Sequence, residues 1–398
     1  MDTIIIKIYG AEKFQIKGFA RSWFLPELAR RRFGDLSPTE KQSTPIRPYL
    51  RHFVFKPPYA DSYLPKIEIF ETLNIGRDDV VYVLMMTFSV PKLLYGDSLQ
   101  EVSELDFEKV LYALKKALLG VGIGVESNVL INARVSAVHF CKNILLPREI
   151  RIQDILAELH RVDINKTTDI TLKEEKNGGR WLHLYSGTIE RVFYDKVADA
   201  LRPKVKRKDK GHMVQERGVI ERYKLTTREV FRYEYRLKKN QTVMRDVGAV
   251  LGRPPKTPVA FKDIFAPDLC KMMLLNSWRA LLQRPENQLA LLGEIDDLGL
   301  LLHIIAEAMK QGRAHSMNHA LTSYGLACAI RDHGAKEVRR AVSVGWNTDH
   351  PERLTHKIQA AAALTAGLPY SNSIAFVDAA LERYELITRS TLEKCGII

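Results

Sequence analysis

The pattern of hydrophobic and polar residues divides the chain into a mixed part and a helical part. Over the first 260 residues, β-branched, aromatic or alternating runs predict strands at 4–9, 65–71, 80–90, 129–141, 180–185, 188–194 and 228–238. Helical spacing predicts helices at 106–119 and 150–160, and Ser186-Gly187 predicts a hairpin turn. This mixture favours an α+β domain on an antiparallel sheet. Two related halves are an open alternative, because no sequence repeat demonstrates them.

A proline-rich segment at 252–258 marks the predicted end of this first domain, since proline continues neither a helix nor a central strand. Beyond it, helical spacing recurs at 261–282, 288–309, 315–332, 336–344, 354–366 and 373–392. We therefore expect an α+β domain at 1–256 and an all-helical domain at 257–398. The helices around His333-Gly334 are a candidate helix-turn-helix, although most helical hairpins do not bind DNA.

The positive charge of the chain is concentrated in one segment. Of a net charge of +13, most comes from residues 201–256, which contain 17 Lys or Arg and 6 Asp or Glu. Such a surplus favours a polyanionic partner, and a solvated basic face with no partner is the alternative. Six of these cations are predicted to follow a DNA backbone from a flexible loop: Arg202, Lys204, Lys206, Arg207, Lys208 and Lys210.

The remaining composition narrows the class of protein. The 4 cysteines are far apart and form no CxxC pair, which indicates neither a zinc ribbon nor a disulfide framework and fits a cytoplasmic protein. No stretch approaches 18 consecutive apolar residues, so we expect no membrane span. The chain has no GxxxxGK[ST] segment, and ATP-driven helicase activity is not expected.

A tyrosine at the end of a predicted strand is the main candidate for covalent chemistry. Tyr194 stands two residues before Lys196 in Arg191-Val-Phe-Tyr-Asp-Lys. A phenolate can attack a phosphodiester, keep the 5′-phosphate as an ester and release a 3′-hydroxyl. Because the phenol has a pKa of about 10, it needs a cation or a metal nearby, and Lys196 is expected to point the same way. The alternative is a buried structural tyrosine, and Tyr185 is the next candidate nucleophile.

A carboxylate between two arginines marks another predicted strand. Glu234 alternates with aromatic residues in Phe231-Arg-Tyr-Glu-Tyr-Arg, so Arg232 and Arg236 share its face. Glu234 is either part of a surface charge ladder or a ligand of Mg²⁺ or Mn²⁺ while the arginines hold phosphate. The aromatics of this strand and Tyr223 either stack on bases or lie in the core.

Histidines supply the other candidate metal ligands. His139 lies in an apolar strand, where we place it on one face with Val135 and Ala137. A lone histidine there is a satisfied core residue unless a carboxylate or second histidine meets it, and His183 is the nearest candidate. The pair at 315 and 319 lacks the glutamate of HExxH and is read as structural.

Four segments in order resemble the replication initiators of the filamentous-phage gene II type and their plasmid-like relatives. They are Thr-Phe-Ser-Val-Pro-Lys-Leu-Leu-Tyr-Gly at 87–96, Val-Ser-Ala-Val-His at 135–139, Phe-Tyr-Asp-Lys at 193–196 and Phe-Arg-Tyr-Glu-Tyr-Arg at 231–236. Together they span roughly residues 80–265, and their order is more specific than any one motif. The histidine-hydrophobe-histidine motif of related single-strand endonucleases is missing.

The resemblance implies roles for four residues. Tyr194 would be the nucleophile, Lys196 its neighbouring cation and Glu234 a catalytic or metal-binding carboxylate. His139 would stand where an aspartate is usual, keeping a ligand for Mg²⁺ or Mn²⁺ but removing a negative charge. The family nicks one strand of a double-stranded origin, stays on the 5′ end and rejoins it after rolling-circle synthesis, with a host helicase and DNA polymerase. The setting implied is the cytoplasm of a bacterium that carries a phage or plasmid.

Three other functions remain open from the sequence. A relaxase or transposase would use the same tyrosine chemistry on a different DNA substrate. A non-catalytic replication or copy-control protein would bind DNA through a helix-turn-helix, with no covalent adduct. An RNA-binding protein would use the basic segment.

Overall fold

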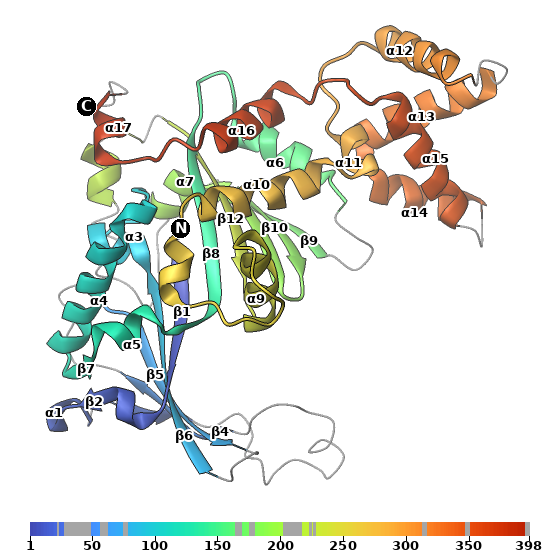
Figure 1. Cartoon of the computed structure of the whole chain (residues 1–398). Coiled ribbons are helices and arrows are strands. Elements are labelled where there is room, and N and C mark those ends of the chain that lie inside the picture. The colour runs from blue at the N-terminus through green and yellow to red at the C-terminus, as the bar shows by residue number, and fades with distance from the viewer. Residues whose placement is uncertain are drawn as a thin grey trace.

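The computed structural model of this chain describes residues 1–21, 24–27, 49–55, 63–74, 79–163, 169–174, 180–201, 217–222, 225, 228–312, 317–346 and 351–394 (Figure 1). The strands are β1 Thr3–Tyr9, β2 Phe14–Ile16, β3 Phe24–Glu27, β4 Tyr49–Phe55, β5 Lys66–Asn74, β6 Asp79–Ser89, β7 Ile123–Val125, β8 Arg134–Leu145, β9 Asp169–Glu174, β10 Arg180–Ser186, β11 Ile189–Asp195 and β12 Val230–Leu237. The first helices are α1 Gly18–Arg21, α3 Val90–Tyr95, α4 Phe107–Gly120, α5 Ser127–Ile131, α6 Ile152–His160, α7 Lys196–Leu201 and α9 Asn240–Val250.

The helices after residue 260 confirm the predicted helical C-terminal region. They are α10 Leu269–Leu282, α11 Pro285–Ala290, α12 Asp297–Lys310, α13 Met317–His333, α14 Ala335–Trp346, α15 Pro351–Leu364, α16 Asn372–Arg383 and α17 Arg389–Lys394. Short 3₁₀ helices lie at η1 Ala11–Lys13, η3 Glu104–Asp106 and η5 Phe261–Phe265. No helix among the described residues is long and apolar enough to cross a membrane.

Ten strands form one sheet in the order β3-β4-β5-β6-β1-β8-β12-β11-β10-β9, and each neighbouring pair is antiparallel. The α+β class and the antiparallel sheet are therefore confirmed. Alternation in the sequence sets the two faces: Ile4, Ile6 and Ile8 of β1 are buried, while the residues between them are half-buried. The hairpin predicted at Ser186-Gly187 joins β10 to β11.

The sheet consists of two halves with the same strand order. In the first half, β1 lies at the centre of the sheet, and β3, β4, β5 and β6 follow in chain order from the outer edge toward β1. In the second half, β8 lies at the centre, and β9 to β12 again follow in chain order from the outer edge toward β8. The central strands β1 and β8 run antiparallel. The topology therefore has an approximate two-fold relation between β1 and β8, in agreement with the alternative of two related halves.

Helices cover one face of this sheet (Figure 1). Phe193 and Tyr233 are fully buried and stacked with ring centroids 4.9 Å apart, and the indole of Trp278 in α10 lies 5.9 Å from the Tyr233 ring. On the other half of the sheet, Phe88 of β6 meets Phe261 of η5 at 5.8 Å. We call the opposite face, which carries Tyr194 and Glu234, the site face.

A β-bulge corrects the expected faces of β8. The register of β1 on β8 shifts between Ile5 and Ile6, so that Ile5 pairs with Ala137 and Ile6 pairs with Val135. Val135 therefore lies on the helix-covered face with the buried Ile6, not on one face with His139 as predicted. An extra residue in one strand changes the alternation of faces, and periodicity alone does not show where it is inserted.

The hydrophobic core of the sheet continues past the boundary predicted at 256. Side chains of η5, α10 and α16 belong to the same core cluster as β1, β8 and β12. A separate cluster lies among α11 to α15, with Leu289, Leu300, Ile304, Ala327 and Ile358 at its centre. The helical region is thus partly a layer on the sheet and partly a helical unit with its own core.

The candidate helix-turn-helix has an unsuitable connection. Only Gly334 separates α13 from α14, whereas a helix-turn-helix has a turn of three or four residues. Gly334 has a φ of +82°, and a Cβ atom there would lie 2.6 Å from the carbonyl oxygen of Arg161. Arg339 of α14 is ion-paired with Asp163. These contacts are those of a packed helical corner and do not favour DNA reading by α14.

Candidate active site

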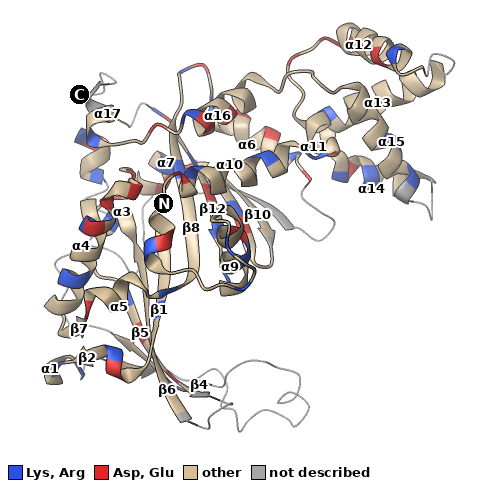
Figure 2. Ribbon diagram, viewed as in Figure 1, with Lys and Arg blue, Asp and Glu red and all other residues tan. Residues whose placement is uncertain are grey.

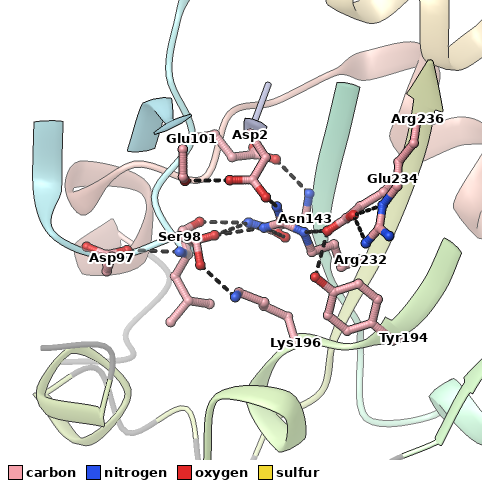
Figure 3. Close-up of polar contacts among 12 residues, drawn as sticks. Asp2, Asp97, Ser98, Glu101, Asn143, Tyr194, Lys196, Arg232, Glu234 and Arg236 are labelled. Atoms are coloured by element: carbon pink, nitrogen blue, oxygen red, sulfur yellow. Dashed lines mark hydrogen bonds and ion pairs between the residues drawn. The ribbon is translucent and has the colours of Figure 1, made fainter. Parts of the chain in front are cut away.

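Strand register brings the predicted nucleophile to the predicted carboxylate. On β11 and β12, Tyr194 pairs with Arg232 and Val192 pairs with Glu234, so all four side chains lie on the site face. The hydroxyl of Tyr194 donates a hydrogen bond of 2.6 Å to Oε1 of Glu234 (Figure 3). Two segments forty residues apart in sequence are therefore joined in one site.

Two arginines hold the carboxylate of Glu234 in its ionised form. Arg232 Nε donates to Oε1 at 2.7 Å, and Arg236 Nε donates to Oε2 at 2.7 Å. Burial by itself would raise the pKa of Glu234, but the charges of Arg232 and Arg236 outweigh burial and hold the pKa well below its usual range. The carboxylate is charged across the neutral pH range, and both of its oxygens accept hydrogen bonds.

Arg232 is the centre of the cluster, with only 1% of its side chain exposed (Figure 3). Its Nη1 donates to the carbonyl oxygen of Ser98 at 2.8 Å, and its Nη2 lies 2.8 Å from Oδ2 of Asp2. The Oδ1 atom of Asn143 accepts a further bond from Nη1 at 3.3 Å. Because these donors bond to protein acceptors, Arg232 holds Glu234, Ser98 and Asp2 in place below the surface. Of the two arginines, Arg236 is the one that a solvent anion such as phosphate could reach, because 27% of its side chain is exposed.

The environment of Tyr194 keeps its hydroxyl protonated. Burial is the main cause and, with the neighbouring Glu234, raises its pKa well above the usual value of about 10, although Arg232 opposes this shift. A protonated phenol next to an ionised carboxylate forms an oriented hydrogen bond without transferring its proton. A reaction at this oxygen would therefore release the proton as the new bond forms.

Lys196 is close to the site, and one of its contacts is with the loop that holds Arg232. It begins α7, is almost fully buried, and its Nζ donates to Oγ of Ser98 at 2.7 Å. The carboxylate of Asp195 accepts from the backbone N–H groups of Val197 and Ala198 at 2.9 and 3.0 Å, which fixes this turn. Lys196 therefore stabilises the loop that holds Arg232.

A buried glutamate ties this loop to the C-terminal part of the chain. Glu101 pairs with Lys142 and accepts from the backbone N–H groups of Asn143 at 2.6 Å and Ile387 at 2.8 Å. Its own N–H donates to the carbonyl oxygen of Ile387 at 2.8 Å. Nothing in the local sequence marked Asp2, Ser98 or Glu101 as site residues, since they reach Arg232 or its supports only through tertiary structure.

The two histidines lie on different strands of the site face and share charged neighbours. His139 pairs across β8 and β12 with Arg236, and burial and that arginine lower its pKa, so the imidazole is neutral at physiological pH. His183 lies 3.4 Å from Oε2 of Glu190 on the neighbouring strand. The charge of Glu190 acts on both imidazoles, and the predicted pairing of His183 with His139 is not among these contacts.

The described residues do not form a closed metal site. They contain no group of three or more His, Cys, Asp or Glu side chains arranged to hold an ion. Glu234 already accepts from Tyr194 and both arginines, so an ion bound to it would replace at least one of these donors. Mg²⁺ or Mn²⁺ therefore stays a prediction for this site.

The predicted DNA contacts are described in part. Arg202, Lys204, Lys206, Arg207, Lys208, Lys210 and Tyr223 lie outside the described residues. Phe231 and Tyr233 are fully buried under the helices and Tyr235 nearly so, which confirms their core alternative. Figure 2 shows acidic and basic residues interspersed over the described helices and strands.

Comparison with protein families, with characterised proteins and with solved structures gives no match for this chain. The relation to the gene II-type replication initiators is therefore a proposal, carried by the four segments in the sequence.

Proposed function

We propose that this protein is a tyrosine-dependent DNA nicking and joining enzyme that initiates rolling-circle replication. The observation that carries the proposal is the Tyr194 hydroxyl, held at 2.6 Å by a carboxylate that two arginines bind on one face of an antiparallel sheet. A structural tyrosine needs one acceptor, but it does not need a guanidinium exposed beside that acceptor. The order of the four sequence segments supports an initiator rather than a nuclease of another type.

Arg236 is the residue best placed to couple DNA binding to the activation of Tyr194. Its guanidinium is partly exposed and bonded to Oε2 of Glu234. A phosphodiester that takes over this guanidinium withdraws one cation from Glu234, which raises the pKa of the carboxylate. Glu234 then becomes a stronger proton acceptor at the moment when the phosphorus atom lies next to Tyr194.

The proposed step balances as a transesterification. The Tyr194 oxygen forms a bond to phosphorus, its proton passes to Glu234, and the bond from phosphorus to the 3′-oxygen breaks. The 3′-oxygen leaves as a hydroxyl with a proton from solvent, and the 5′-phosphate stays on the enzyme as an ester that the reverse step rejoins. A divalent ion bound with the DNA would polarise the scissile phosphate.

The test is covalent capture of the DNA. The protein, single-stranded origin oligonucleotides labelled on the 3′ side of the nick, and Mn²⁺ are incubated and run on a denaturing gel. We expect a protein–DNA band that survives SDS and disappears in Tyr194→Phe. Tyr82→Phe is the matched control, since Tyr82 is an exposed tyrosine of β6 on the helix-covered face.

Two results would contradict the proposal. A band that persists in Tyr194→Phe assigns the chemistry to another residue. Non-covalent binding with no band under any divalent ion favours a non-catalytic DNA-binding protein. A band on transfer-origin or transposon-end oligonucleotides, with none on the replication origin, keeps the chemistry and replaces the initiator with a relaxase or transposase.

A further inference from the structure

Strand β10 carries a row of ring-bearing residues beside the nucleophile. In the register of β10 on β11, Trp181 pairs with Tyr194, His183 with Val192 and Tyr185 with Glu190. Paired residues share a face, so the three rings lie on the site face. Tyr185 lies near the hairpin end of β10, and 39% of its surface is exposed.

The charges around this row present cations to solvent. Glu190 is buried beneath the row and pairs with Lys238 and with Arg236, whose Nη1 lies 3.6 Å from it. Lys238 is about half exposed, and its Nζ lies 5.5 Å from the centre of the Tyr185 ring. The acid is thus hidden while the two cations and the ring face outward.

We propose that four side chains, which we call the strip, bind single-stranded DNA next to the nick. They are Trp181 and Tyr185 of β10, Arg236 of β12 and Lys238, which directly follows β12. Rings would stack on bases, while the two cations contact phosphates on either side. The occupant is single-stranded because stacking on a flat strand requires unpaired base faces. The inference rests on the proposed function, since it places the strip's DNA in line with Tyr194.

This role differs from the one considered for Tyr185 from the sequence. Its hydroxyl donates to the carbonyl oxygen of Gly187 at 3.1 Å, so the structure gives it a backbone acceptor where Tyr194 has Glu234. Four residues along β10 separate Tyr185 from the level of Tyr194, about 13 Å at the rise of a strand. Tyr185 therefore lies where neighbouring nucleotides pass and not where the phosphate reacts.

The test is a binding measurement in the Tyr194→Phe background, which removes cleavage. Fluorescence anisotropy with a labelled single-stranded oligonucleotide should show affinity lowered about tenfold by Tyr185→Ala. Tyr185→Phe should bind nearly as well as the parent, because the ring does the stacking. Tyr82→Ala is the matched control: its exposed fraction is 37%, and it lies on the other face of the sheet.

A second readout uses the tryptophan of the strip. DNA should quench part of the intrinsic fluorescence, and this part should be lost in Trp181→Phe. Unchanged affinity in Tyr185→Ala together with unchanged quenching in Trp181→Phe overturns the strip. So does an equal loss of affinity for duplex DNA of the same sequence.

These results are separable from a failure of the proposed function. If the strip has no role, Tyr185→Ala in the protein that retains Tyr194 still forms the SDS-resistant band. A wrong nucleophile removes the role of Tyr194 but leaves the binding difference between Tyr185→Ala and Tyr185→Phe intact.

Discussion

Both halves of the sheet bury carboxylates on the site face, and Glu234 of the second half and Glu68 of the first half have different partners. In the second half, Glu234 binds Arg232, Arg236 and the Tyr194 hydroxyl. In the first half, Glu68 lies 3.0 Å from Nε2 of His52 and 2.8 Å from Nζ of Lys66. Both carboxylates are nearly inaccessible, so burial does not distinguish them.

The partners explain why only one half is a candidate active site. Arg232 is a buried planar fork whose donors fix several acceptors at once, whereas Lys66 is a point charge with 57% of its side chain exposed. The described contacts of Glu68 include no hydroxyl nucleophile. The guanidinium groups and the tyrosine hydroxyl thus distinguish the candidate site from the Glu68 cluster. A buried acid alone is a structural feature of this sheet.

The largest effect should come from exchanging the two carboxylates for amides. Glu234→Gln should lower covalent adduct formation by about 10²–10³-fold, because the amide neither accepts the Tyr194 proton nor keeps both arginines. Glu68→Gln should change it less than about twofold. Initial rates of adduct formation measure both, and equal losses would mean that the two halves are functionally equivalent.

Cation replacement should separate the halves in stability. Arg232→Met removes the buried cation that Asp2 and Glu234 share, and should lower the free energy of unfolding by about 3–5 kcal/mol. Lys66→Met removes an exposed cation and should change it by less than about 0.5 kcal/mol. Urea denaturation gives both values. A small effect at Arg232 would show that the cluster tolerates its loss.

Asp2 tests whether the site belongs to the second half alone. It stands just before β1 in the first half, yet its carboxylate pairs with Arg232 and accepts from Ser89 at 2.6 Å. Asp2→Asn keeps the shape but turns a charged contact into a neutral one, at a cost of about 1 kcal/mol. The melting temperature should fall by a few degrees. A change confined to DNA binding would place Asp2 in the substrate site instead.

The smallest effect should be on the acid side of the stability curve. The folded pKa of Glu234 lies below its unfolded value, so its stabilisation is present above about pH 4.5 and is lost as the pH falls toward the folded pKa. His139, whose folded pKa is lowered, adds an earlier loss that begins below about pH 6.5. The free energy of unfolding, measured from about pH 3 to 8, should therefore fall less steeply on the acid side in Glu234→Gln than in the parent. Equal slopes in the two proteins would contradict the ionised state.

Local pattern predicted the elements of this fold better than their assembly. Runs of β-branched, aromatic or alternating residues located β1, β12 and the hairpin of β10 and β11, although both faces of β12 are buried. Local pattern missed β2, β3, β4, β7 and β9, and it showed neither that β1 lies beside β8 nor that β8 contains a bulge. Such pairings depend on partners far away in sequence.

The site shows the same division. Tyr194 and Glu234 were predicted because each lies in a distinctive local motif, and the structure brings them together. Asp2 and Ser98 were not predicted, because a short acidic or hydroxyl side chain outside a motif has no local signal of its position. The burial of Arg232 was equally hidden, since the residues that enclose it come from four segments of the chain.

The contact between Glu101 and Ile387 determines when the candidate active site can be completed during synthesis of the chain. The two residues are 286 positions apart, and the hydrogen bonds of Ile387 complete the contacts of the loop that holds Arg232. A nascent chain on the ribosome exposes Tyr194 long before that contact can form, and pairing over such a separation is slow. We expect translation products that end before Ile387 to lack this support of the candidate active site.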